Sequence, residues 1–474
     1  MGRKRKKKIV ENLLITGLAD KGKGMGRDAE GRVIFVEGRV APGDVVDVLI
    51  KKRRSAFWQG FVIAFRQMSE ERVQPFCKHF DSCGGCTYQH LPYEAQLRYK
   101  EERVRDILQR IGKIEPGEFL PILPAEPNVF YRNKMEYAFS NRRWLTAEEL
   151  AQPEISNRED VLGFHRAGAF DKIVPIEECW LQEDPSNEIR NFMGELARRQ
   201  ELPFFDLREG SGMMRHLLIR IASTGEIMLI VSFFEKDMQA IRCYLDAVLR
   251  RFPQITTLAY CINPKANDYI LDLDMHIYHG KGFIEEKLGD LRFKIQPKSF
   301  FQTNTRQAVR LYDRIIEFAG LDGSQTVYDL YTGVGSIALY VARAAKKVIG
   351  IEEIPDAITD AIENARINKI ENCSFYAGDV RKVLSKAFAK RHGKADLVIT
   401  DPPRAGMHQD VVDFLLQLRA PKIVYVSCNP ATQARDLQLL SEAYQVEKIQ
   451  PVDMFPHTYH VETIALLRLK TQNE

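Results

Sequence analysis

The sequence predicts an α/β protein whose C-terminal part is a parallel sheet covered by helices on both faces. From residue 326 onward, near-continuous apolar strands alternate with helical stretches, which is the pattern of buried parallel strands. Residues 10–67 instead contain short strands between glycine turns, as in a small β-barrel. Residues 120–290 mix strand-like and helical patterns, so a central α+β region is expected to join the two.

The composition is that of an ordinary globular protein with several domains. The 474 residues are 45% hydrophobic and 28% charged, which excludes a disordered or collagen-like chain. No apolar run approaches the roughly 18 residues of a membrane span, and no signal peptide follows the basic N-terminus. Eight cysteines are too few for a disulfide scaffold. We therefore expect a cytoplasmic monomer without a membrane anchor.

Basic residues are concentrated at the N-terminus. Residues 1–54 hold 15 Lys and Arg against 7 Asp and Glu, and Arg3–Lys8 and Lys51–Arg54 are unbroken basic runs. One such run is usually a solvated tail or loop. Two runs in one small segment favour a polyanion partner, because each neutralised phosphate releases counterions.

The predicted elements follow from periodicity and from glycine and proline positions. In the barrel we expect strands at 12–18, 32–36, 44–51 and 58–65, with a turn at 21–26. A helix is predicted over 92–111, because apolar residues such as Leu97 and Val104 share one face. The central region has strands at 213–221 and 226–234 and a polar inserted loop at 141–160. The C-terminal strands are expected at 327–331, 347–352, 373–379, 397–401 and 423–428, the helices at 336–346 and 355–370, and a final hairpin at 445–453 and 463–469.

Ligands of such sheets bind beyond the carboxyl ends of the strands. The turn Asp329–Gly335 there lacks a complete dinucleotide glycine motif. Glu352 ends the next strand and suits paired ribose hydroxyls, and Asp379 after the third could meet an adenine amine. A ribose acid and an adenine acid without a phosphate cradle fit S-adenosylmethionine, although an ordinary turn with surface acids is the alternative.

Three further residues at this edge could carry chemistry. Asp401 opens a rigid Asp-Pro-Pro turn that can present its carboxylate to a pocket. A cysteine at a strand end is usually inert, but the Asn-Pro turn after Cys428 places it where a thiolate could act as a nucleophile. Glu462, between the last two strands, is a candidate general base, with a solvated loop acid as the alternative.

Cys77, Cys83 and Cys86 lie within ten residues and indicate a metal site. A fourth ligand must come from elsewhere, and Cys179, Cys243 and Cys261 all compete for that role. Three clustered cysteines plus a distant one favour an iron–sulfur cluster over zinc, which usually shows two ligand pairs.

Together these motifs closely resemble the bacterial RNA uracil-5-methyltransferases, particularly those acting on 23S ribosomal RNA, over nearly the whole chain. Residues 10–67 resemble the family's TRAM domain, an OB-like RNA-binding barrel. Residues 427–432 and 453–458 resemble two highly specific catalytic segments, and residues 296–304 resemble the opening of the catalytic domain. Residues 172–179 resemble the segment before the last cluster ligand, so the resemblance implies a [4Fe-4S] cluster on Cys77, Cys83, Cys86 and Cys179.

The resemblance also implies the catalytic roles. Cys428 would be the nucleophile and Glu462 the base of a Rossmann-like methyltransferase domain. The residues implied to contact S-adenosylmethionine are Gln302, Tyr331, Ser336, Glu352, Asp379 and Asp401. The sequence departs from the family pattern at Tyr331-Thr332, where Phe-Cys is expected, at Ser336, where a polar amide is common, and in the length of 141–160.

The implied organisation has three domains: a basic tail and TRAM domain at 1–67, a central cluster-bearing domain at 68–294, and a catalytic domain at 295–474. Helix 92–112 could pack on the catalytic domain. The expected function is methylation of C5 of a uridine in 23S rRNA. Transfer RNA is the alternative substrate, and a catalytically idle RNA-binding or assembly factor is the alternative class.

Overall fold

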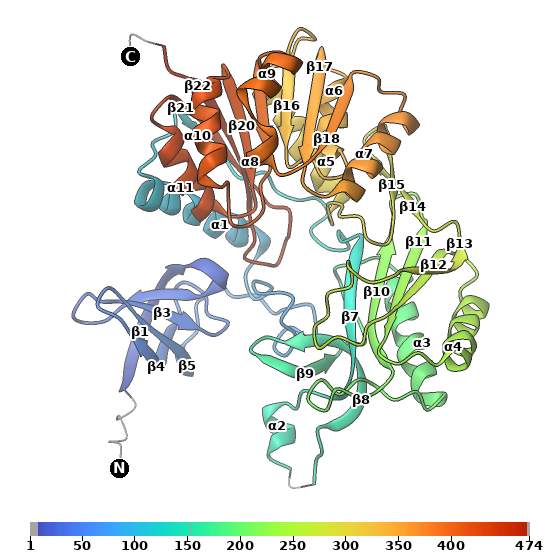
Figure 1. Ribbon diagram of the computed structural model, residues 1–474. Coiled ribbons are helices and arrows are strands. Elements are labelled where there is room, and N and C mark those ends of the chain that lie inside the picture. The colour runs from blue at the N-terminus through green and yellow to red at the C-terminus, as the bar shows by residue number, and fades with distance from the viewer. Residues whose placement is uncertain (1–7, 153, 472–474) are drawn as a thin grey trace, which may run out of the picture.

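The computed structural model describes residues 8–152 and 154–471, which form three parts, each built on its own sheet (Figure 1). All of the basic run Arg3–Lys8 except Lys8 lies outside these residues. None of the helices in the two ranges combines the length and the apolar character that a membrane span requires.

The N-terminal part is a closed five-stranded barrel with the strand order β1-β2-β3-β5-β4, which confirms the predicted barrel. The glycine stretch predicted as a turn also supplies a strand, because a Cβ on Gly26 would lie 2.4 Å from the Leu14 carbonyl oxygen and only glycine lets β1 and β2 pair this closely. The strands are β1 (Lys8–Leu18), β2 (Gly24–Arg27), β3 (Val33–Glu37), β4 (Val45–Arg53) and β5 (Trp58–Gln67).

The central part is a seven-stranded sheet with the order β13-β12-β11-β10-β7-β8-β9. Helices α3 (Ser186–Arg199) and α4 (Met238–Arg251) share its apolar core. The predicted polar insertion contains the short helix α2 (Ala147–Leu150). The strands are β7 (Lys134–Arg142), β8 (Arg158–Arg166), β9 (Ala169–Pro175), β10 (Met214–Ile221), β11 (Ile227–Phe233), β12 (Ile255–Ile262) and β13 (His276–Gly280).

The C-terminal part is an eight-stranded sheet with the order β18-β17-β16-β19-β20-β22-β21-β6. The first five strands are parallel, as predicted, and the predicted final hairpin forms, with β22 between β20 and β21. The strands are β16 (Thr326–Leu330), β17 (Lys347–Glu352), β18 (Cys373–Ala377), β19 (Leu397–Thr400), β20 (Lys422–Ser427), β21 (Tyr444–Val452), β22 (Glu462–Leu469) and the edge strand β6 (Glu118–Phe119).

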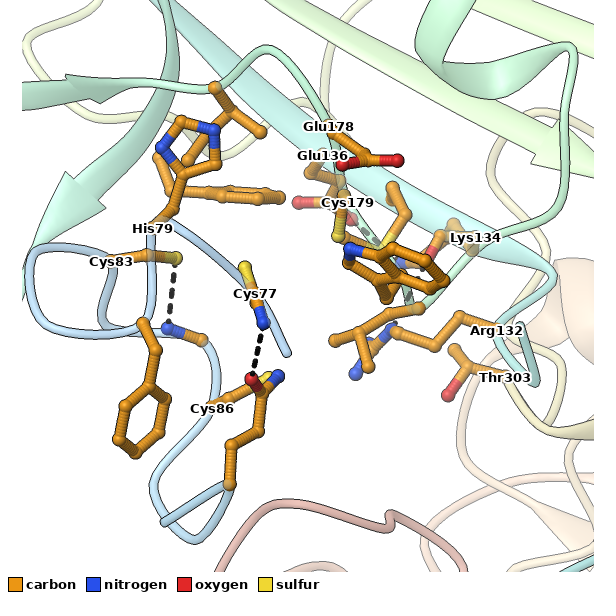
Figure 2. A pocket seen from close by; sticks show the side chains of 18 residues that line it. Cys77, His79, Cys83, Cys86, Arg132, Lys134, Glu136, Glu178, Cys179 and Thr303 are labelled. Carbon is orange, nitrogen blue, oxygen red and sulfur yellow. Dashed lines mark hydrogen bonds and ion pairs between the residues drawn. The ribbon is translucent and has the colours of Figure 1, made fainter. Parts of the chain in front are cut away.

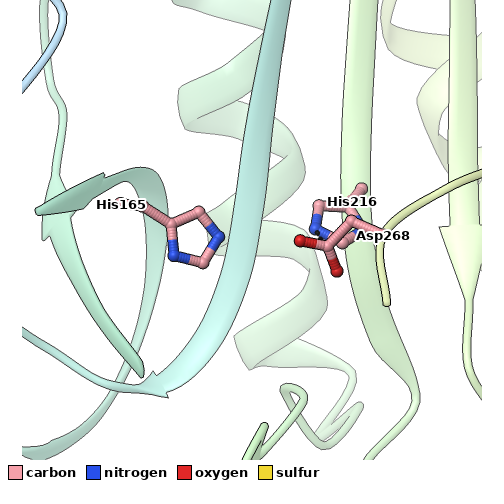
Figure 3. A group of neighbouring side chains, drawn as sticks. All are labelled: His165, His216 and Asp268. Carbon is pink, nitrogen blue, oxygen red and sulfur yellow. Dashed lines mark ion pairs between the residues drawn. The ribbon is translucent and has the colours of Figure 1, made fainter. Parts of the chain in front are cut away.

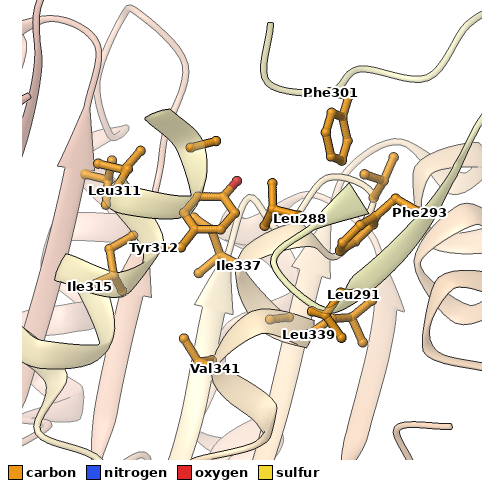
Figure 4. Close-up of a cluster of buried hydrophobic side chains, with 14 of the residues drawn as sticks. Leu288, Leu291, Phe293, Phe301, Leu311, Tyr312, Ile315, Ile337, Leu339 and Val341 are labelled. Carbon is orange, nitrogen blue, oxygen red and sulfur yellow. The ribbon is translucent and has the colours of Figure 1, made fainter. Parts of the chain in front are cut away.

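Alternate residues of these strands enter two different apolar cores, so helices cover both faces of the sheet. One core includes α5 (Thr305–Ala319), α6 (Ser336–Ala342) and the small hairpin β14 (Ile284–Leu288) and β15 (Leu291–Ile295), as Figure 4 shows. The remaining helices are α7 (Pro355–Ile367), α8 (Val380–Val383), α9 (Lys386–His392), α10 (Gln409–Leu418) and α11 (Pro430–Leu440).

Helix α1 (Tyr93–Ile107) and the π-helical turn η2 (Leu108–Gly112) that continues it lie against the C-terminal sheet (Figure 1). They contact α11, and α1 also contacts β21, whose edge pairs with β6. A segment that precedes the central sheet in the sequence therefore completes the C-terminal layer.

Candidate active site

The strand register brings Cys428 and Glu462 together. In the antiparallel pair β20–β22 the last partners are Ser427 and Thr463. Cys428 directly follows β20 and Glu462 is the first residue of β22, so both lie at the same end of this strand pair. Glu462 is near enough for its charge to contribute to the raised pKa of the Cys428 thiol. The thiol and the carboxyl group thus lie near one another at the carboxyl end of the sheet.

Burial and nearby carboxyl groups raise the pKa values of these groups. Burial, with the nearby carboxyl groups of Glu462 and Asp401, raises the pKa of the Cys428 thiol to about 11. Burial and the same Asp401 raise the pKa of Glu462 to about 8, and burial raises the pKa of Asp401 to about 7. Perturbed acids that cluster in one place are typical of catalytic sites.

Arg404 is a neighbour of this group that the sequence reasoning missed. Its guanidinium opposes the upward pKa shifts of both Cys428 and Glu462. The turn that carries it is fixed from the nucleophile side, because Asn429 Nδ2 donates to the Arg404 carbonyl oxygen at 2.9 Å. Its place in the Asp-Pro-Pro-Arg turn is the one signal that the sequence offers for it.

A second group of polar atoms surrounds the glycine turn after β16. Glu352 accepts backbone hydrogen bonds from Gly333 and Ile354, both at 3.1 Å, which fixes its carboxylate beside the turn. A Cβ on Gly333 would meet open space, so the outer side of the turn is free to receive a ligand. Asp329 is buried, and among the described residues its Oδ1 has no hydrogen-bond partner.

The other residues implied to contact the donor lie around the same edge with different local partners. Tyr331 follows β16 with a φ of +64°, and Ser336 begins α6 with its hydroxyl 2.9 Å from that of Tyr312. Asp379 caps α8 and is paired by the Arg381 guanidinium, with Nε 2.9 Å from each carboxylate oxygen. Gln302 is half-buried just before α5.

The four predicted cluster cysteines line one cavity of about 360 Å³. Figure 2 shows Cys77, Cys83 and Cys86 on one loop and Cys179 approaching from the central part. No cysteine of the described residues forms a disulfide, and no three of their sulfur atoms lie within 4.8 Å of one another. The other two candidates for the fourth position, Cys243 and Cys261, do not line this cavity.

A separate trio, His165, His216 and Asp268, lies in the central part (Figure 3). Its members already have protein partners: Asp268 Oδ1 accepts from Arg215 at 3.0 Å and lies 3.4 Å from His216 Nε2. His165 Nδ1 is 3.0 Å from the Phe170 carbonyl oxygen. Ordinary ion pairing and hydrogen bonding account for this trio.

A parallel sheet with an open glycine turn after β16 and an acid at the end of the neighbouring strand is the arrangement of Rossmann-like domains, among them the methyltransferases that use S-adenosylmethionine. Comparison with known proteins refines this class. The family model for tRNA (Uracil-5-)-methyltransferase matches residues 273–470, and that for the TRAM domain matches residues 5–62.

Similar full-length proteins support the same conclusion. An uncharacterized RNA methyltransferase of Bacteroides thetaiotaomicron is 52% identical over 441 residues, covering 92% of this chain and 97% of that protein. One of Porphyromonas gingivalis is 50% identical over 465 residues, covering 97% and 100%. The chain belongs to the RNA uracil-5-methyltransferase family and is an RNA methyltransferase with a TRAM domain.

A solved structure matches almost the whole chain. The crystal structure of Pyrococcus abyssi tRNA (uracil-54, C5)-methyltransferase, in complex with S-adenosyl-L-homocysteine, superposes with a TM-score of 0.73 and 29% sequence identity. The match covers 97% of this chain and all of that one, so it includes the barrel, the central sheet and the catalytic sheet.

Proposed function

We propose that this enzyme methylates C5 of a uridine through a covalent bond between Cys428 and C6 of the base. The observation that carries the proposal is the pairing of β20 with β22, which ends at Ser427 and Thr463 and so brings Cys428 and Glu462 to the same end of the two strands. A nucleophile and a general base close to one another are what this chemistry requires. Family membership favours this active enzyme over an idle RNA-binding factor.

The thiol is needed because C5 of uracil is too weak a nucleophile to attack a sulfonium methyl group. Addition of the Cys428 thiolate to C6 turns the ring into an enolate whose C5 is nucleophilic. When bound, S-adenosylmethionine supplies the electrophilic methyl group. Glu462 then removes the proton from C5, and elimination breaks the bond from sulfur to C6 and releases the cysteine.

The methyl donor would bind at the part of the site formed by the glycine turn after β16. Gly333 leaves open space beside the turn, and the Glu352 carboxylate fixed there offers an acceptor for a polar, cationic ligand. Asp401 contributes to the raised pKa values of both Cys428 and Asp329, which supports a place for it near both the methyl donor and the nucleophile. Gln302, Tyr331, Ser336 and Asp379 complete the proposed donor contacts.

The test uses RNA transcripts containing 5-fluorouridine, whose C5 fluorine cannot leave as a proton. With the methyl donor present, the wild type should form a complex with this RNA that resists denaturation, and Cys428→Ala should form none. Cys373→Ala is the matched control, because Cys373 is another half-buried cysteine of the same sheet. An adduct that survives in Cys428→Ala, or its absence from the wild type, would refute the mechanism.

We propose 23S rRNA as the substrate, on the resemblance of the sequence motifs, with tRNA as the second candidate. The solved P. abyssi relative acts on tRNA and matches the entire architecture, so the barrel does not discriminate between the two RNAs. Mapping 5-methyluridine in both RNAs from a strain lacking the gene would decide. Loss of a 5-methyluridine from 23S rRNA that the wild-type gene restores, but Cys428→Ala does not, would support 23S rRNA as the substrate. Loss of a 5-methyluridine from tRNA alone would support tRNA.

We further propose that Cys77, Cys83, Cys86 and Cys179 hold a [4Fe-4S] cluster. The spacing of the cysteines in the sequence supports this over zinc. Zinc sites usually show two ligand pairs, whereas iron–sulfur sites often combine three clustered cysteines with a distant one, and Cys179 lines the same cavity as the three clustered cysteines. Such a cluster would hold the loop 77–86 to the central part, and methyl transfer from a sulfonium needs no redox step.

Iron and acid-labile sulfide analysis of anaerobically purified protein tests this assignment. About four irons per chain and a brown colour are expected, both lost in Cys179→Ser but kept in Cys261→Ser. A colourless protein carrying one zinc would contradict the proposal.

A further inference from the structure

Helix α1 buries polar side chains where an amphipathic helix would place apolar ones. Gln96, Lys100 and Arg103 stand at i, i+4 and i+7 and so lie on one face. Gln96 and Lys100 are fully buried, at 0% and 1% exposure. Buried polar groups are costly unless they are hydrogen-bonded, so their partners indicate what this face is for.

The partners lie in the loop 453–461, which joins β21 to β22 and leads directly into Glu462. Lys100 Nζ donates to Asp453 Oδ1 at 2.7 Å and to the Phe455 carbonyl oxygen at 3.1 Å. Arg103 Nη2 donates to the Tyr459 carbonyl oxygen at 2.6 Å.

Gln96 holds the middle of the same loop at His457. Its Oε1 accepts from the His457 backbone N–H at 2.9 Å, and its Nε2 lies 3.2 Å from His457 Nδ1. His457 has a φ of +64°, in the left-handed region that a non-glycine residue adopts only when its surroundings impose it. The helix therefore holds the loop in a shape it would not keep alone.

A second segment holds the loop from the cysteine side. The backbone N–H groups of Thr87 and Tyr88, directly after Cys86, donate to the His457 carbonyl oxygen at 2.8 and 3.0 Å. The Tyr131 hydroxyl donates to the Pro456 carbonyl oxygen at 3.0 Å. All of these contacts come from residues outside the C-terminal stretch that carries the proposed catalytic groups.

We propose that Gln96, Lys100 and Arg103 are positioning residues for Glu462. This inference rests on the base role given to Glu462 under the proposed function. The strand pair fixes Glu462 on one side through Val452, and the loop held by α1 fixes it on the other. With the loop released, Cys428 can still add to the base, but Glu462 no longer meets the C5 proton.

The decisive variant is Arg103→Met, which removes the bond nearest Glu462. Arg98→Met is the matched control, because Arg98 lies on the same helix, is 48% exposed and pairs with Glu71 instead. Gln96→Leu provides an independent second variant. The readouts are kcat and KM for uridine-containing RNA and the fraction of enzyme in a denaturation-resistant complex with it.

Arg103→Met should lower kcat by about tenfold, because the free energy of one hydrogen bond corresponds to about a tenfold change in rate. KM should not change, and the covalent complex on ordinary uridine RNA should accumulate as in Glu462→Gln, while Arg98→Met behaves as the wild type. A raised KM without accumulated complex would instead make Arg103 an RNA contact and overturn the proposal. If Arg103→Met lost turnover and the 5-fluorouridine adduct to the same extent, the proposal would also be overturned. Failure of the wild type to form that adduct would refute the proposed function itself.

Discussion

The ionisation of Glu462 predicts how the enzyme responds to pH. Burial and the neighbouring Asp401 raise the pKa of this carboxyl group to about 8. Only about a tenth of the base is then ionised at pH 7, about half at pH 8 and about nine-tenths at pH 9. The proton-removal step should speed up about fivefold from pH 7 to 8 and less than twofold from pH 8 to 9. A carboxyl group with an ordinary pKa would give a constant rate over this range.

Single-turnover methylation with enzyme in excess isolates this step. The denaturation-resistant complex on uridine RNA first forms and then decays, and its decay reports proton removal and elimination. Formation depends on the Cys428 thiol, whose pKa is raised to about 11, so it should keep accelerating up to pH 9.5 while the decay levels off. Glu462→Gln should decay slowly at every pH. A wild-type decay rate that is flat or falls between pH 6.5 and 9.5 would refute the reasoning.

Two further predictions concern stability. The folded enzyme keeps a proton on Glu462 that the unfolded chain releases, so the free energy of unfolding falls as pH rises from about 4.5 towards 8. Glu462→Gln should therefore raise the melting temperature at pH 8 but not at pH 4. An equal effect at both pH values would contradict this. Gly26→Ala should destabilise the barrel by about 1–3 kcal/mol, because its Cβ would lie 2.4 Å from the Leu14 oxygen. Gly17→Ala, with no atom nearer than 3.7 Å, should not, and hydrogen exchange of the barrel amides compares the two.

The strands of the C-terminal sheet could be predicted because buried parallel strands are apolar along their whole length. The position of β22 could not, since only long-range pairing inserts it between β20 and β21 and brings Cys428 near Glu462. The two-residue strand β6 is too short to leave a pattern. The domain limits at residues 67 and 294 stay a prediction, and α1 and β6 lie with the catalytic sheet although they precede the second limit.

Helix α1 was predicted from its apolar face, and its polar face was unexplained by the sequence. The reason is physical: the partner of Lys100 is Asp453, which lies 353 residues further along the chain. Local periodicity reports which side of a helix avoids water, but it cannot report a buried ion pair whose second member is so distant.

The same distance has a consequence for synthesis of the protein on the ribosome. Helix α1 emerges early, with a buried lysine that has no counter-ion until Asp453 has been made, and Glu462 follows later still. Cys428 is translated before either acid, so an unfinished chain carries the reactive thiol without the residues that complete the reaction. The pair of Cys428 and Glu462 therefore cannot assemble until Glu462 has been made.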